Sequence, residues 1–162
     1  MTNAQIDMPG LGKVVEVTDS PPGDRFWAGA FDYRDDGAPR RSVFYLSVGG
    51  EAVPARAQLE FARAIMAAID RHIDGARALL ADRLRADPGF FGLDDDAAAR
   101  HLERGAAFLP FDIPEPTFYA PEAWQIRFAE SPLPRCQIRG VAVTFSGTTP
   151  VKIEDLSEST PI

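Results

Sequence analysis

A helical pattern of apolar residues occupies the middle of the chain and constrains its fold more than any other feature. Apolar side chains recur at steps of three and four from Leu59 to Leu84, and charged side chains fall on the opposite side. The pattern predicts one amphipathic helix of roughly 30 residues. Gly75 lies inside it and costs the helix about 1 kcal/mol relative to alanine, so the sequence leaves open whether the helix is kinked or broken there. A helix with a single apolar face has to pack against another layer.

Strand patterns precede this helix. Residues 14–17, 25–33 and 42–48 are rich in β-branched and aromatic side chains and are separated by turn sequences. The short connections predict an antiparallel meander. Apolar residues alternate onto both faces of the second and third strands, so we expect this sheet to be covered, at least in part, on both sides.

A short helix and a proline-rich segment follow the long helix. The acidic residues 94–96 are expected to cap a helix that ends near Gly105, because carboxylates accept hydrogen bonds from free N–H groups at a helix start. Residues 108–121 contain four prolines and four aromatic residues. This composition excludes a helix and predicts a stiff, extended segment.

The chain ends in further strand patterns. Residues 124–129 and 137–145 predict a terminal antiparallel hairpin, to which residues 151–153 could add a short edge strand. The predicted fold class is therefore α+β: an antiparallel meander, a long amphipathic helix plus a short helix, and a terminal antiparallel hairpin packed with the meander.

The chain is expected to form one domain. Its 162 residues suit a single core, which we place at residues 11–154. Residues 1–10 are expected to be a flexible N-terminal arm, and residues 155–162 an acidic C-terminal tail.

The formal net charge of −7 limits the classes of partner. No third of the chain is net basic, so a nucleic-acid partner is not expected. The sequence has no apolar run of membrane-spanning length and no signal-peptide pattern, so we expect a cytoplasmic protein that does not bind a membrane. An acidic surface would attract a basic protein if its charges gather on one face.

Motifs for catalysis or cofactor binding are absent from the sequence, and we predict no cofactor and no metal site. Cys136 is the single cysteine, and it could act as a thiol nucleophile only beside His72 or His101. The alternative interpretation is a small buried hydrophobic residue. Asp70 and Asp74 lie one helical turn apart, where a solvated charged face is favoured over an acid–base pair. The sequence leaves catalytic activity undecided and favours none.

Two segments are candidates for partner binding. Stiff aromatic segments are favoured at interfaces because they lose little entropy on binding, and acidic turns attract basic surfaces. The alternatives are that the aromatic residues cover the end of the core and that a loop tip is charged only because it is solvated. The candidate partner-binding residues are Asp32, Asp35 and Asp36 in the acidic turn and Phe111, Phe118 and Tyr119 in the proline-rich segment.

The order of elements resembles that of a group of small uncharacterised bacterial α+β proteins. The likeness is carried by the aromatic hairpin around Phe26-Trp27-Ala28-Gly29, the long helix, and the terminal hairpin with residues 139–143 (Arg-Gly-Val-Ala-Val). Some of these proteins look like immunity proteins encoded beside polymorphic toxins. The resemblance covers most of the chain, carries over no functional residue, and implies an acidic, cytoplasmic, non-catalytic protein that occludes a toxin's active site.

The favoured function is therefore a non-catalytic protein-binding module, with an immunity-type inhibitor of a basic toxin as its specific form. A small enzyme or ligand-binding domain, with a pocket between the sheet and the long helix, is the first alternative. A structural homo-oligomer, including a homodimer, is the second.

Overall fold

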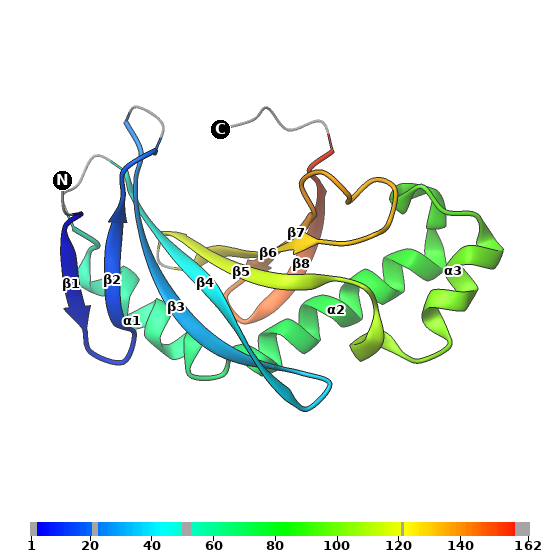
Figure 1. Cartoon of the computed structure of the whole chain (residues 1–162), viewed down its shortest axis with the longest axis horizontal. Helices are drawn as coiled ribbons and strands as arrows, with labels where there is room; N and C mark the ends of the chain where they lie inside the picture. The colour runs from blue at the N-terminus through cyan, green and yellow to red at the C-terminus, as the bar shows by residue number, and fades with distance from the viewer. Residues whose placement is uncertain (1–2, 21–22, 50–52, 121, 158–162) are drawn as a thin grey trace.

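Both strand-rich ends of the chain belong to one sheet (Figure 1). The computed structural model describes residues 3–20, 23–49, 53–120 and 122–157, and in this part of the chain the sheet has eight strands. They lie in sequence order, and all neighbours are antiparallel except β4 and β5. The strands are β1 (Gln5–Met8), β2 (Gly12–Val17), β3 (Arg25–Asp35), β4 (Ala38–Gly49), β5 (Asp112–Ala120), β6 (Ala123–Glu130), β7 (Val141–Ser146) and β8 (Thr149–Asp155).

The α+β class and the antiparallel meander are confirmed, and the proline-rich segment is extended as predicted, as strand β5. The first ten residues differ from the expected flexible arm. Gln5 to Met8 form β1, which pairs with β2, and Met8 is buried in the core. An apolar side chain therefore anchors this segment. At the other end, β8 reaches Asp155, and residues 158–162 of the expected tail lie outside the described residues.

The long helical pattern is divided between two helices, α1 (Arg56–Met66) and α2 (Ile69–Ala86), so the prediction of one continuous helix was wrong. The break lies at Ala67 and Ala68, where Ala68 has φ −126° and ψ 30°. Gly75 remains inside α2, since a single glycine costs a helix only about 1 kcal/mol.

Three shorter helical segments follow α2: η1 (Pro88–Phe91), α3 (Asp95–Leu102) and η2 (Ala106–Phe108). The predicted acidic cap is confirmed, because the Asp94 side chain accepts a hydrogen bond from the Ala97 backbone N–H at 2.8 Å.

The last hairpin is shorter than predicted. Residues 137–140 do not join β7, because the Gly140 backbone N–H donates instead to the Cys136 carbonyl at 2.8 Å. Gly140 has φ 74°, and a Cβ there would collide with the Phe128 carbonyl. The first part of the expected strand is therefore a turn, in which the Gly140 backbone lies close to the Phe128 backbone.

The core lies between one face of the sheet and the helices α1 and α2 (Figure 1). Alternate residues of each strand point into it. No helix of the described chain covers the opposite face, so the expected second cover of the sheet is absent. The largest fully buried side chains include Phe44, Leu46, Ile73, Leu80, Phe118, Trp124, Ile126 and Phe128.

The parallel junction between β4 and β5 is very short. Only Tyr45 with Thr117 and Leu46 with Phe118 are paired. The same strand β5 pairs with β6 along almost its whole length, from Asp112 to Ala120. Prolines at 114 and 116 lie on β5 before the paired residues, and a proline has no N–H to donate to a neighbouring strand.

A glutamine side chain from α1 bridges this junction. The Nε2 group of Gln58 donates to the Ser47 carbonyl of β4 at 2.7 Å and to the Phe118 carbonyl of β5 at 3.0 Å. Gln58 is 4% exposed. The buried amide therefore supplies two hydrogen bonds across a junction that the backbone pairs over two residues only.

We predict that Gln58→Leu lowers the free energy of unfolding by about 2 kcal/mol, because two carbonyls at the junction lose their donor. Urea unfolding followed by circular dichroism measures this loss. The matched control is Gln137→Leu, which removes one exposed hydrogen bond to the Pro132 carbonyl and should cost less than about 0.5 kcal/mol. Equal losses in the two variants would show that the Gln58 bridge does not hold the junction.

Candidate functional site

The uncovered face of the sheet, named here the open face, is the candidate site. Its centre is a row of residues that are neighbours in register from β2 to β8. Strand alternation directs these side chains away from the helices. The row consists of Val15, Ala28, Tyr45, Thr117, Gln125, Thr144 and Lys152.

Two tyrosines of the open face, Tyr45 within this row and Tyr119 beside it, lie close to Arg127. Burial raises the pKa of Tyr45, which Glu115 raises further and Arg127 lowers. Burial also raises the pKa of Tyr119, where Glu154 adds to the rise and Arg127 opposes it. Both hydroxyls therefore stay protonated at neutral pH and can donate hydrogen bonds. Tyr119 is 48% exposed.

The charges at the centre of the open face are paired. Arg127 donates through Nε at 3.0 Å and Nη2 at 2.8 Å to one oxygen of Glu115, its cross-strand neighbour. The Nζ atom of Lys152 lies 3.3 Å from Oε1 of Glu154, and both residues are on β8. Aromatic rings, a positioned arginine and few unpaired charges are the composition of the central part of protein interfaces.

The three aromatic candidates do not lie on one surface, because alternation along β5 separates Phe118 from Tyr119 and Phe111 precedes the strand. Phe111 and Phe118 are both 0% exposed, whereas Tyr119 lies on the open face. Phe118 stacks on Trp124 with ring centroids 5.5 Å apart, and Phe111 packs on Phe91 at 5.7 Å. The two phenylalanines therefore cover the core, as the alternative interpretation held, and a partner cannot contact them in this structure.

The acidic turn at the tip of the β3–β4 hairpin is balanced by arginines. Asp32 is exposed and lies opposite Arg41 in register. Asp35 pairs with Arg40 at 3.1 Å, and Asp36 occupies the turn with φ 51°. With Arg34 included, the tip contains three aspartates and three arginines, so it carries no net negative charge, unlike the acidic turn that the sequence suggested.

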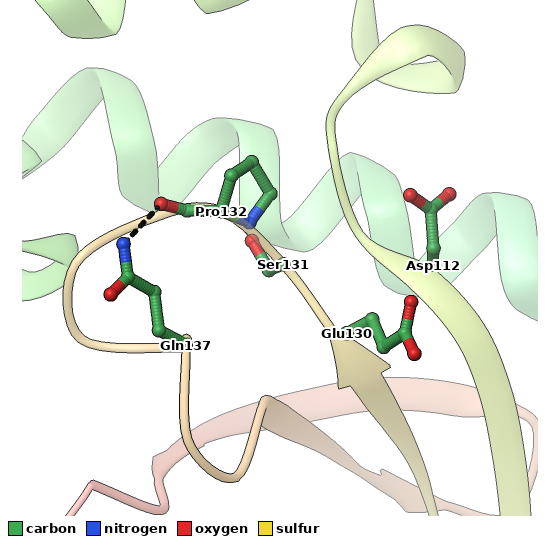
Figure 2. A pocket seen from close by; sticks show the side chains of 5 residues that line it. All are labelled: Asp112, Glu130, Ser131, Pro132 and Gln137. Carbon is green, nitrogen blue, oxygen red and sulfur yellow. Dashed lines mark hydrogen bonds between the residues drawn. The ribbon is translucent and has the colours of Figure 1, made fainter.

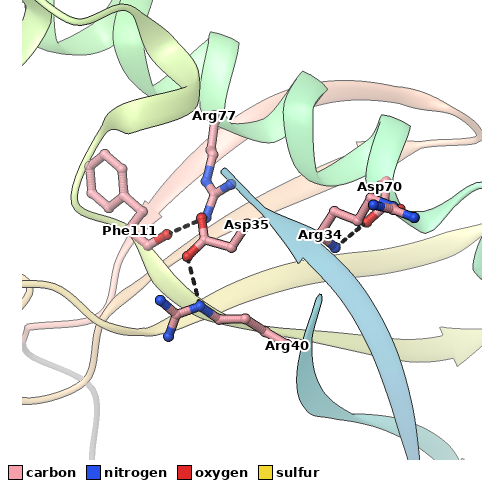
Figure 3. Close-up of polar contacts among 6 residues, drawn as sticks. All are labelled: Arg34, Asp35, Arg40, Asp70, Arg77 and Phe111. Atoms are coloured by element: carbon pink, nitrogen blue, oxygen red, sulfur yellow. Dashed lines mark hydrogen bonds and ion pairs between the residues drawn. The ribbon is translucent and has the colours of Figure 1, made fainter. Parts of the chain in front are cut away.

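A buried arginine on α2 links this hairpin to the helical layer, by which we mean α1, α2 and the three shorter helical segments (Figure 3). Arg77 is 3% exposed, and its Nη2 group donates to the Phe111 carbonyl at 3.0 Å and lies 3.5 Å from Asp35. The Arg34 backbone N–H donates to Asp70 at 2.8 Å. Asp70 is thus a structural acceptor. Arg77 lies four residues after the buried Ile73, on the core side of α2.

A separate pocket of about 340 Å³ lies where β5 begins and β6 ends, lined by Asp112, Glu130, Ser131, Pro132 and Gln137 (Figure 2). It does not lie between the sheet and the long helix, where the enzyme alternative placed one. Burial and the nearby Asp35 carboxylate raise the pKa of Asp112, while Arg77 lowers it. The lining contains two carboxylates but no thiol or imidazole.

The thiol and imidazole candidates are not brought together. Cys136 is 2% exposed, and burial, with a smaller effect of Asp155, raises the pKa of its thiol to about 11. His72 packs edge-on against Trp124, with ring centroids 5.4 Å apart, and burial lowers its pKa. No hydrogen bond links Cys136 to a histidine in the part of the chain that the structure describes.

No protein-family model, curated protein or solved structure matches the chain. Within the described ranges, no group of three or more His, Cys, Asp or Glu residues is placed to hold a metal ion. None of the helices there is long and apolar enough to span a membrane. The assignment of function depends on the geometry of the described surfaces.

We predict that native Cys136 does not react with Ellman's reagent at pH 8, because its buried thiol stays protonated below a pKa of about 11. It should react at once in urea. Ala120→Cys, which places a thiol on an exposed position, should add one fast-reacting equivalent to the native protein. Fast labelling of the unmodified chain would contradict the described burial.

We predict that Asp112→Asn raises the urea midpoint at pH 7 and that this gain vanishes near pH 3. The pKa of Asp112 is higher in the folded chain than its ordinary value. Ionisation of this carboxyl group therefore destabilises the fold once the pH exceeds the ordinary pKa of an aspartate. Asp74→Asn, on the exposed side of α2, is the control and should change neither midpoint. A lower midpoint for Asp112→Asn at pH 7 would reverse the sign and refute this argument.

Proposed function

We propose that the chain is a non-catalytic protein-binding module and that the open face is its binding surface. The observation that carries this proposal is the half-exposed Tyr119 beside Tyr45 and the positioned Arg127, on a sheet face that no helix of the described chain covers. Tyrosine and arginine are enriched among binding hot spots, and both combine a large contact area with hydrogen-bonding groups.

The rigidity of the open face supports binding without chemistry. Its residues lie on paired strands, and Glu115 already fixes the guanidinium group of Arg127. Ordering these side chains on association therefore costs little entropy. Strands spaced about 4.8 Å apart give the sheet a width of about 30 Å, enough for the roughly 800 Å² per partner of a standard interface.

An immunity-type inhibitor is the specific form of this proposal. The resemblance in the order of elements and the formal net charge of −7 support it. Such an inhibitor blocks a basic toxin by covering it, which requires a rigid surface and no catalytic group. In a structural homo-oligomer the same face would be buried between copies, and light scattering over a range of concentrations distinguishes that case.

The test is affinity capture from a lysate of the organism that encodes the chain, followed by titration calorimetry with the captured protein after purification. We expect a 1:1 complex whose dissociation constant rises about tenfold or more in Tyr119→Ala. The matched control is Phe108→Ala, which truncates a similarly exposed aromatic residue on the helical layer and should leave the affinity unchanged. Equal affinities of the two variants would refute binding through the open face.

A further inference from the structure

The two ends of the open face carry different charge. At the hairpin tip, the three aspartates Asp32, Asp35 and Asp36 lie within the same turn region as Arg34, Arg40 and Arg41, so the charges there sum to zero. The other end contains the β2–β3 and β5–β6 turns, because β3 begins, and β4 and β5 end, at that edge. These turns expose Asp19, Asp24 and Glu122, none of which has an ion pair or hydrogen bond among the described residues.

The basic side chains at this end are already engaged. The Nε atom of Arg25 lies 3.8 Å from Oε1 of Glu16, and the Nε atom of Arg56 lies 2.9 Å from Oε1 of Glu60. Each of these pairs is neutral as a whole, so the turn carboxylates remain in excess at this end. We call Asp19, Asp24 and Glu122 the acidic end of the open face.

The acidic end borders the aromatic part of the open face. Phe26 is the second residue of β3 and lies opposite Val17 and Ser47 in register. Tyr119 is the last residue but one of β5, close to the β5–β6 turn that carries Glu122. A partner that covers these rings would therefore approach the three carboxylates as well.

We propose that the partner is a protein with a basic segment, which contacts the acidic end while its apolar residues cover Phe26 and Tyr119. This inference rests on the proposed function and adds the orientation of the basic partner on the open face. Unpaired carboxylates at the periphery of an interface attract a basic surface over long range and fix its orientation, whereas the paired charges at the centre contribute little to this attraction.

The probe is a fluorescein-labelled nona-arginine peptide, titrated at low ionic strength into the ¹⁵N-labelled chain. We expect amide shifts at the β2–β3 turn, at Phe26 and around Glu122. Neutralising the acidic end by Asp19→Asn, Asp24→Asn and Glu122→Gln together should raise the peptide's dissociation constant about threefold or more and flatten its salt dependence.

The matched control neutralises three exposed carboxylates on the helical layer, by Asp74→Asn, Asp82→Asn and Glu103→Gln. Both triple variants change the net charge equally, so a larger effect of the first identifies the acidic end as the contact. Equal effects, or shifts confined to the helical layer, would overturn the inference even if Tyr119→Ala abolishes partner capture. Conversely, an unchanged affinity of Tyr119→Ala refutes the proposed function, whatever nona-arginine does.

Discussion

The parallel junction of β4 and β5 determines the arrangement of the other elements. Antiparallel neighbours can be joined by tight turns, but a parallel pair needs a crossover connection, and here α1 and α2 provide it. Because both helices belong to one crossover, both lie on the same face of the sheet. The opposite face is left without a helix in the described chain. The open face is thus a direct consequence of one short junction, at which two residues of each strand pair and Gln58 supplies two further hydrogen bonds.

Buried polar side chains hold the two halves of the sheet to the helices. Gln58 acts from α1, and Arg77 acts from α2 through the Phe111 carbonyl and Asp35. A buried guanidinium group is costly unless it is paired, so its partners determine where the hairpin tip can lie. Asp35, a candidate for partner binding in the sequence, is therefore used inside the protein.

Features set by neighbouring residues could be predicted from the sequence, and features set by distant pairing could not. Alternation predicted β3, β4 and β6, a β-branched run predicted β2, and the cap at Asp94 follows from a contact three residues away. The break at Ala68 could not be predicted, because alanine favours the helical conformation more than glycine does, and the glycine of this pattern, Gly75, lies elsewhere.

The proline-rich segment was expected to be extended but not to be a central strand, where proline is disfavoured. Its hydrogen bond to Gln58 joins residues that are 60 positions apart in the chain. Of the candidate site, Tyr119 was named, whereas Tyr45 and Arg127 were not, since their proximity arises only when β4, β5 and β6 are neighbours.

Paired and unpaired charges occupy different parts of the open face. A charge that is already paired, as in Arg127 with Glu115, keeps its partner when a protein covers it, so covering the centre leaves no isolated ion without water. An unpaired carboxylate resists such burial but acts over about 10 Å at moderate salt while it stays hydrated. The open face places the first kind at its centre and the second kind at one end. For the proposed basic partner, this division means that the turns would supply the attraction and the tyrosines the area from which water is excluded, without burial of an unpaired charge.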